Sequence, residues 1–181
     1  PYETSPVKLR LHPYRLCLIK NAWYVIARPV DEESPRTYRV ARFKSIRMLD
    51  DSANVPQDFR LRDYFGNAWA VFRGAESYDV EVLFTPDAAR VATETVWHHT
   101  QTSTTHKDGS VTLKFQVDGL EEIVRWVVGW AGKVKVIKPA VLVAKVLFLH
   151  RHAFQVNSQR GGKKAGKMEV SPNPAATDDI A

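Results

Sequence analysis

Residues 78–152 alternate between strand and helix signals in an order that few small folds share. From Tyr78 to Phe84 apolar and polar side chains alternate, which predicts a half-buried strand. Thr85 and Pro86 follow as an N-cap and a first-turn proline, so a helix is predicted to run to about Glu94. The remaining predicted elements are a strand at 96–101, a strand at 111–117 after the Asp108-Gly109 turn, a helix at 120–130, a strand at 133–138 and a helix at 139–152. This β-α-β-β-α-β order with a trailing helix predicts an α+β module of the ferredoxin-like type.

The first 52 residues carry only short strand signals, so this part is predicted to be mainly β. Apolar and polar side chains alternate on either side of Pro13, and Lys20-Asn21-Ala22 predicts a tight turn because asparagine tolerates left-handed geometry. The predicted strands lie near residues 7–11, 14–19, 23–28, 36–41 and 44–49. Five short antiparallel strands are too few for a two-layer sandwich. They can close into a small Sm-like or SH3-like β-barrel, which also removes exposed sheet edges.

The segments outside these two modules complete the predicted domain organisation: a barrel at 1–52, a connector at 53–77, the α+β module at 78–152 and a tail at 153–181. In the connector, Asp58 can cap a short helix to about Tyr64, which Gly66 and Asn67 end. From Gln155 onward the composition changes to Gly, Lys, Ser, Pro, Ala and Asp. Such a segment buries too little apolar surface to offset its ordering entropy, so the tail is predicted to be disordered.

Composition excludes several classes of protein. No apolar run reaches 18 residues, which excludes a membrane-spanning helix and predicts no membrane partner. The single cysteine, Cys17, excludes a disulfide framework and a site with several thiolate ligands, and it fits a reducing, cytoplasmic location. The sequence starts at Pro1 without a signal-peptide pattern, so we interpret the chain as a fragment of a longer protein.

No constellation of residues points to catalysis, a metal or a cofactor. His98 and His99 are adjacent on a predicted strand and so point to opposite faces, while His150 and His152 are poorly spaced to share an ion. The sequence contains no G-x-S-x-G turn, and Gly161-Gly162-Lys163-Lys164 lacks the flanking strand and helix of a phosphate loop. We therefore expect a protein that is not an enzyme and that uses no metal and no cofactor.

Positive charge and aromatic side chains concentrate in the first 52 residues. Ten Lys and Arg residues stand there against six Asp and Glu, which supplies +4 of the net charge of +6. Arginine forks match phosphate geometry and aromatic faces stack on bases, so a small barrel with both predicts a platform for nucleic acid or a nucleotide. The alternative is that the arginines are solvated and Trp23 lies in the core. The candidate set is His12, Arg15, Trp23, Tyr24, Arg28, Arg36, Arg39, Arg42 and Arg47.

Three motifs in this region resemble the WYL domain. They are His12-Pro13-Tyr14-x-Leu16, Asn21-Ala22-Trp23-Tyr24-Val25, and Arg36-Thr37-Tyr38-Arg39-Val40-Ala41-Arg42-Phe43. The second half resembles the C-terminal extension that usually follows a WYL domain, with matching pieces at 80–84, 97–101, 108–110 and 126–139. The resemblance covers about residues 7–145. Val25, Ala41 and Phe43 depart from the Leu, Asp and Ile that the family motif has at these positions.

The resemblance implies that the chain is the effector-sensing region of a bacterial transcriptional regulator. Members of this family mostly join an N-terminal winged helix-turn-helix to a WYL barrel and an extension that dimerises or regulates. Their effector is a nucleic-acid fragment, such as single-stranded DNA, or a nucleotide. Carried over residue by residue, the resemblance implies ligand-binding roles for His12, Tyr24, Arg36, Arg39 and Arg42. No helix-turn-helix precedes residue 7, so we expect this chain alone not to read an operator.

Strand geometry limits how these residues can meet one ligand. On a regular strand Arg36 and Arg42 share a face and Arg39 points the other way. All three can contact one ligand only if a bulge or the strand end re-aims one of them, and Arg42 is the candidate. Of the neighbours Trp23 and Tyr24, one must face the core, and we expect Trp23 to do so.

The second half suggests a rival function. Trp126, Trp130 and Phe148 are expected to be exposed near the ends of predicted elements, which predicts a homodimer through this half. The alternative to a ligand sensor is therefore a protein-interaction or dimerisation module of a defence-system regulator that binds no nucleic acid.

Overall fold

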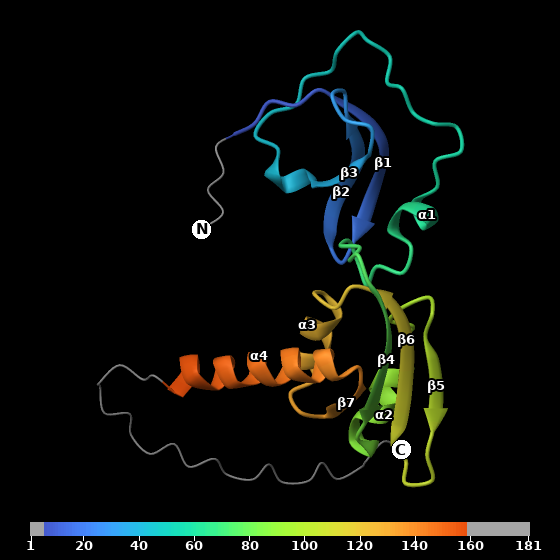
Figure 1. The fold of residues 1–181 in the computed structure, drawn as a ribbon, viewed down its shortest axis with the longest axis vertical. Coiled ribbons are helices and arrows are strands. Elements are labelled where there is room, and N and C mark those ends of the chain that lie inside the picture. The colour runs from blue at the N-terminus through green and yellow to red at the C-terminus, as the bar shows by residue number, and fades with distance from the viewer. Residues whose placement is uncertain (1–5, 159–181) are drawn as a thin grey trace, which may run out of the picture.

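The computed structural model describes residues 6–158, which form two antiparallel sheets joined by a connector (Figure 1). The first sheet has three strands, β1 (Leu11–Ile19), β2 (Ala22–Pro29) and β3 (Arg36–Arg39), in the order β1-β2-β3. The predicted tight turn is confirmed: Lys20 and Asn21 both have positive φ and join β1 to β2 as a two-residue hairpin loop. β1 continues through Pro13, where a shift of register before Arg15 accommodates a residue that has no N–H for the ladder.

The predicted closed barrel is wrong, because the first sheet is open. Strand β3 ends at Arg39, and Val40–Arg42 form a 3₁₀ turn, η1, closed by the Phe43 N–H bonding to the Val40 carbonyl. This turn takes the chain out of the ladder, so residues 44–49 have no neighbouring strand and are not a strand themselves. Ile46 and Met48, which alternate with polar residues in the sequence, are exposed. Residues 7–10 are likewise outside the sheet.

The connector packs against the first sheet through aromatic side chains. Its helix α1 (Leu61–Phe65) ends at Gly66, whose positive φ of 53° only glycine adopts readily. Asp58 is not the cap that was predicted, since Arg60 holds the N-cap position without a side-chain hydrogen bond. Phe59 contacts Tyr14 edge to face with ring centroids 4.9 Å apart. The Tyr64 and Thr37 hydroxyls lie 2.9 Å apart, which ties α1 to β3.

The second half has the order of elements that the sequence predicts. Its sheet contains β4 (Ser77–Phe84), β5 (Thr102–Thr105), β6 (Val111–Asp118) and β7 (Val134–Lys138), in the order β5-β6-β4-β7 with every pair antiparallel. The helices are α2 (Pro86–Thr93), α3 (Ile123–Val128) and α4 (Ala140–Ser158). Pro86 starts α2 after Thr85, as predicted, although the Thr85 hydroxyl donates to the Lys133 carbonyl and does not cap the helix.

Two segments of the second half differ from the prediction. Residues 96–101 are not a strand, because side chains replace the ladder: Gln101 Oε1 accepts the Trp97 N–H at 2.9 Å. The strand begins only at Thr102. Helix α4 continues to Ser158, so residues 153–158 are helical and not part of a disordered tail. The rest of the predicted tail, 159–181, lies outside the described residues.

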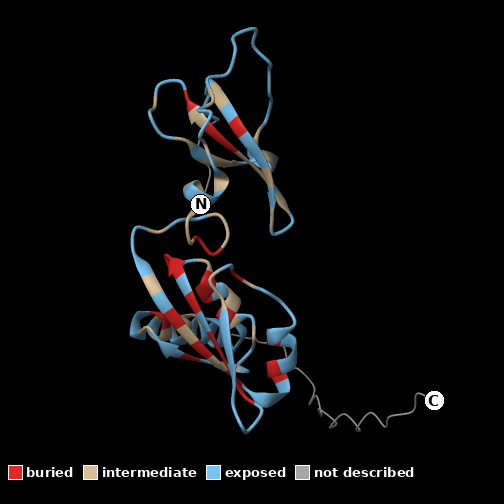
Figure 2. Ribbon diagram, turned by 90° about the vertical axis from the view of Figure 1, so that its right-hand side faces the viewer, coloured by how far each residue is buried: buried red, intermediate tan, exposed pale blue. Residues whose placement is uncertain are grey.

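Most buried residues belong to the second half, on the strands of its sheet and on its helices (Figure 2). Phe84, Leu113, Leu120, Ile123 and Leu142 are among the fully buried ones. The first sheet contributes Tyr14, Ile26, Ala27 and Pro29 as its buried apolar residues. Within residues 6–158, no helix is both long and apolar enough to cross a membrane.

Three tryptophans lie differently from what the sequence predicts. Trp23 is 50% exposed, so it does not form the core of the first sheet. Trp126 and Trp130 were expected at the surface, but both pack against the buried cluster, with Trp130 meeting the Phe84 ring edge to face at 4.9 Å. Of the predicted exposed aromatics only Phe148, on α4, is largely exposed.

Candidate functional site

Tyr24 and Arg39 lie directly opposite each other on β2 and β3 and therefore share one face of the first sheet. Cys17 on β1 also pairs with Tyr24 and completes a row across the sheet. Tyr24 is half-buried and Arg39 is exposed. An aromatic ring beside a guanidinium on an accessible face is an arrangement that can hold a base and a phosphate.

Arg36 does not join this pair. It lies opposite Ala27 and three residues before Arg39, so the pleat sends it to the other face of the sheet. Its Nε donates to Glu32 Oε2 at 2.6 Å, in an ion pair that solvent reaches. Arg42 leaves the alternation of β3 altogether, because it sits in the η1 turn. Of the three arginines, therefore, one shares the face of Tyr24.

His12 occupies the far end of the same face. It pairs with Arg28, four residues along β2 from Tyr24, which separates the two side chains by about 13 Å. Its Nδ1 accepts the Asn54 N–H at 3.0 Å, and the neighbouring Arg10 pairs with Asp51 at 2.6 Å. These two contacts hold residues 51–54 against β1. The structure thus gives His12 a partner in the connector and keeps it apart from Tyr24 and Arg39.

A cleft of about 470 Å³ opens between β3 and the connector. Its lining residues include Arg36, Thr37, Tyr64, Phe65, Phe72 and Arg73. Four of these six residues come from the connector, which sequence reasoning treated only as a link between modules. The signal that could have found them is the alternation of aromatic and basic residues over 59–73, which matches that of the first 52 residues.

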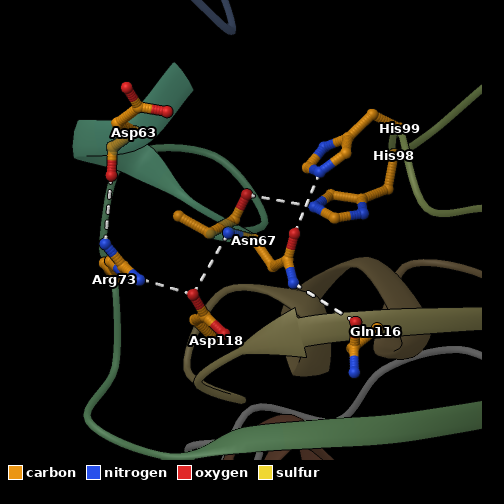
Figure 3. A network of polar contacts seen from close by, with 8 residues as sticks. Asp63, Asn67, Arg73, His98, His99, Gln116 and Asp118 are labelled. Carbon is orange, nitrogen blue, oxygen red and sulfur yellow. Dashed lines mark hydrogen bonds and ion pairs between the residues drawn. The ribbon is translucent and has the colours of Figure 1, made fainter. Parts of the chain in front are cut away.

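A network of hydrogen bonds fixes the connector to the second sheet (Figure 3). Asp118, at the end of β6, accepts from the Asn67 N–H and from Arg73 Nε, each at 3.1 Å. Arg73 also donates to the Asp63 carbonyl at 3.2 Å. Burial would raise the pKa of Asp118, but the hydrogen bonds from Asn67, Ser77 and Arg73 outweigh it and lower that pKa overall. Asp118 is therefore an ionised anchor at the junction.

Glu122 makes the second attachment. Its carboxylate accepts the backbone N–H groups of Ala70, Val71 and Phe72, with the shortest distances to Oε2 at 2.8, 3.0 and 3.2 Å. Three amides converging on one carboxylate are strong, charge-assisted partners. Because Glu122 immediately precedes α3, it holds this loop against the start of that helix.

Trp69 links all three parts of the chain. It is 5% exposed and stacks on His98 with centroids 5.6 Å apart and planes 7° from parallel. Lys20, in the β1–β2 turn, places its Nζ 5.5 Å from the Trp69 ring centroid. Burial lowers the pKa of Lys20, and the charge of Glu122 partly offsets this. The tip of the first sheet, the connector and the second half therefore meet at one indole.

His98 is buried as a neutral imidazole. Its Nε2 lies 3.2 Å from the Ala68 carbonyl, and its Nδ1 accepts the Thr100 N–H at 3.3 Å, which fits a proton on Nε2. Burial lowers the pKa of His98, and the adjacent His99 lowers it further. Protonation of His98 would place a charge in this buried position beside Trp69, which is unfavourable.

Acid is therefore expected to weaken the fold through His98. Because its pKa is lower in the folded chain than the ordinary value of 6.5, the unfolded chain takes up the proton first. Stability is then complete above about pH 6.5 and falls as the pH drops toward the folded pKa. The urea midpoint, followed by tryptophan fluorescence, should decrease from about pH 7.5 to 5.5 more in the native chain than in His98→Gln. Equal pH dependence in both chains would contradict this assignment. Carboxyls whose pKa is lowered, such as Asp118, reduce the stability only below about pH 4 and so do not contribute in this range.

Comparison with known proteins identifies both halves of the chain. The profile of the WYL domain matches residues 1–48, and the profile of the WCX domain matches residues 76–153. No curated protein sequence matches significantly. Among solved structures, the chain is similar to proteasome accessory factor B/C (PafBC) of Arthrobacter aurescens, with a TM-score of 0.40 and 15% identity. That match covers 90% of this chain and 25% of the other, so this chain spans about a quarter of the length of that protein. With a WYL domain followed by a WCX domain, the chain belongs to the family of WYL-domain proteins.

Proposed function

We propose that the chain is the effector-sensing region of a bacterial transcriptional regulator, which binds single-stranded nucleic acid or a nucleotide and signals to a DNA-binding domain outside residues 1–181. The observation that carries this proposal is the pairing of half-buried Tyr24 with exposed Arg39 on one face of the WYL-domain sheet. The same region holds most of the excess positive charge of the chain. An aromatic platform beside an arginine fork suits a base and its phosphate. We further propose that the region acts in the cytoplasm, without catalysing a reaction, and that the WCX half has a ferredoxin-like fold.

Salt dependence of binding tests the phosphate contacts. Of the three arginines only Arg39 shares the face of Tyr24, and one phosphate contact to a single strand contributes about −0.7 to the log-log slope of affinity against salt. Arg39→Gln should reduce that slope by about 0.7 and weaken binding similarly for every sequence. The matched control is Arg90→Gln on α2, whose arginine is exposed and pairs with Glu94 at 2.9 Å. The measurement is fluorescence anisotropy of labelled oligothymidine titrated across salt concentrations.

Tyr24→Ala separates stacking from charge. Loss of a stacking platform should cost about 1–3 kcal/mol of binding free energy with little change in the salt slope. Duplex DNA should bind more weakly than single strands, because the described part of the WYL domain has three strands and one 3₁₀ turn and no α-helix to enter a groove. Equal affinity for both forms, or an unchanged slope in Arg39→Gln, would favour the protein-interaction module over the ligand sensor.

We also propose that the chain forms a homodimer through α4. What supports this is the C-terminal half of that helix, where four large apolar side chains are more than half exposed: Leu147, Phe148, Phe154 and Val156. Leu147 and Phe154, seven positions apart, share one face of the helix and Phe148 borders it. An exposed apolar face of this kind is typical of an interface. Light scattering at tens of micromolar should give a dimer mass, and Phe148→Glu with Phe154→Glu should give a monomer. Val91→Glu on α2, also at an exposed position, is the control, and a monomeric native chain would exclude the dimer.

A further inference from the structure

The cleft between β3 and the connector combines the side chains that a nucleotide requires. One wall carries Arg36 and Thr37 from the WYL domain, and the other carries Tyr64, Phe72 and Arg73 from the connector. None of the described residues that line it is acidic. Its volume of about 470 Å³ lies within the range of small-molecule sites. The cleft is thus a basic, partly aromatic cavity that spans two parts of the chain.

Both arginines keep donors for a ligand. Arg36 meets Glu32 through Nε, and among the hydrogen bonds of residues 6–158 its two terminal nitrogens have no partner. Arg73 uses Nε on Asp118 and one terminal nitrogen on the Asp63 carbonyl, which leaves the second terminal nitrogen. A guanidinium has five N–H donors in a fixed fork, so these contacts orient the two groups without saturating them.

Phe72 supplies an aromatic face. Its side chain is 57% exposed, and within the described part of the chain its ring stacks on no other aromatic ring. The backbone beneath it is fixed, because the Phe72 N–H bonds to Glu122 at 3.2 Å. Exposure of the Phe72 ring to water is unfavourable, and a base stacked on the ring would remove that cost. The fixed backbone keeps the ring in the same cleft as the two arginines.

We propose that this cleft binds one phosphorylated nucleotide unit, with Arg36 and Arg73 on the phosphate and Phe72 against the base. The proposal rests on the proposed function and extends the site from the WYL sheet to the connector. The unit is either the 5′ end of a single strand or a free nucleotide, since both present the same chemistry. Because Arg73 also holds Asp118 at the end of β6, a ligand here touches the junction between the WYL and WCX domains.

Binding to variants of the full chain tests this site. The probes are labelled oligothymidine with and without a 5′-phosphate, and thymidine monophosphate as a competitor. Phe72→Ala and Arg73→Gln should each weaken binding of the phosphorylated strand at least about fivefold. Arg62→Gln is the matched control, because Arg62 is an exposed arginine of α1 that does not line the cleft. If thymidine monophosphate displaces the strand, a free nucleotide is sufficient to fill the cleft. If the 5′-phosphorylated strand binds more tightly and the monophosphate does not displace it, the ligand is the 5′ end of a strand.

The outcomes separate this site from the proposed function. If Arg39→Gln weakens binding while Phe72→Ala and Arg73→Gln leave it unchanged, the cleft is not the site and the sensing role stands. If neither oligonucleotide nor monophosphate binds, both proposals fail. Arg73→Gln removes an ion pair and can reduce stability, so thermal unfolding is measured alongside. Phe72→Ala carries the test in that case, since its exposed ring makes no core contact.

Discussion

Trp69→Ala is expected to lower the free energy of unfolding by about 3–5 kcal/mol, the cost of removing a large buried aromatic side chain. Trp69 is 5% exposed and its ring meets Phe115 and Trp126 at 5.1 and 5.0 Å between centroids. It also supports His98 on the WCX side and Lys20 on the WYL side. The residual cavity would therefore lie where the two domains and the connector meet. Urea unfolding followed by circular dichroism measures the loss.

Trp23→Ala is the matched control for this substitution. Trp23 is 50% exposed on β2, so its loss should cost about 1 kcal/mol. A large loss of stability in Trp23→Ala together with a small one in Trp69→Ala would contradict the assignment of Trp69 as the central packing residue. The affinity for nucleic acid should not change in Trp23→Ala, because Tyr24 faces away from Trp23 on the same strand.

Local signals predicted most elements of this chain because the causes are local. The Lys20-Asn21 turn and the start of α2 at Pro86 follow from backbone preferences of those residues, and both occur where the sequence places them. The order of strands and helices over residues 77–158 also follows, since each element has its own periodicity. The exception is 96–101, where the side chains of Gln101 and His98 bond to nearby backbone and compete with the ladder.

Closure of the first sheet and the burial of individual tryptophans could not be predicted in this way. Whether residues 44–49 pair depends on the direction in which η1 turns the chain, which periodicity does not contain. Trp69 is buried by partners that lie 29 to 57 positions further along the sequence, His98 and Trp126 among them. Trp23, which its strand position predicted to be in the core, is half exposed, whereas Trp69 is buried by these distant partners.

The candidate site shows the same division. Alternation along β3 correctly separates Arg36 from Arg39, because strand geometry fixes the face of each. His12 lies at the opposite end of this face from Tyr24, because the register pairs it with Arg28, and Asn54 of the connector donates to it there. Arg73 and Phe72 were missed because only the packing of the connector on β3 brings them to Arg36.

Glu122→Ala is expected to destabilise the chain by about 2–3 kcal/mol, although Glu122 lies at the surface end of α3. Its carboxylate accepts three consecutive backbone N–H groups, and hydrogen bonds to a charged group are each stronger than neutral ones. Part of the loss is recovered because Phe72 is an exposed residue, where water can replace the lost carboxylate. The three amides at 70–72 should therefore exchange hydrogen faster in the variant. The Asn67 amide, which bonds to Asp118, should follow once the loop loosens.

Glu121→Ala is the control, one residue earlier on the same turn. Glu121 is exposed and contacts Lys145 at 3.5 Å and the Leu120 N–H at 3.0 Å, so its removal should cost less than about 1 kcal/mol and leave exchange at 70–72 unchanged. If both variants behave alike, the carboxylate of Glu122 does not hold the loop. If only Glu122→Ala loosens it, the backbone beneath Phe72 and Arg73 is fixed from the WCX domain, and a ligand that orders these side chains is energetically coupled to α3.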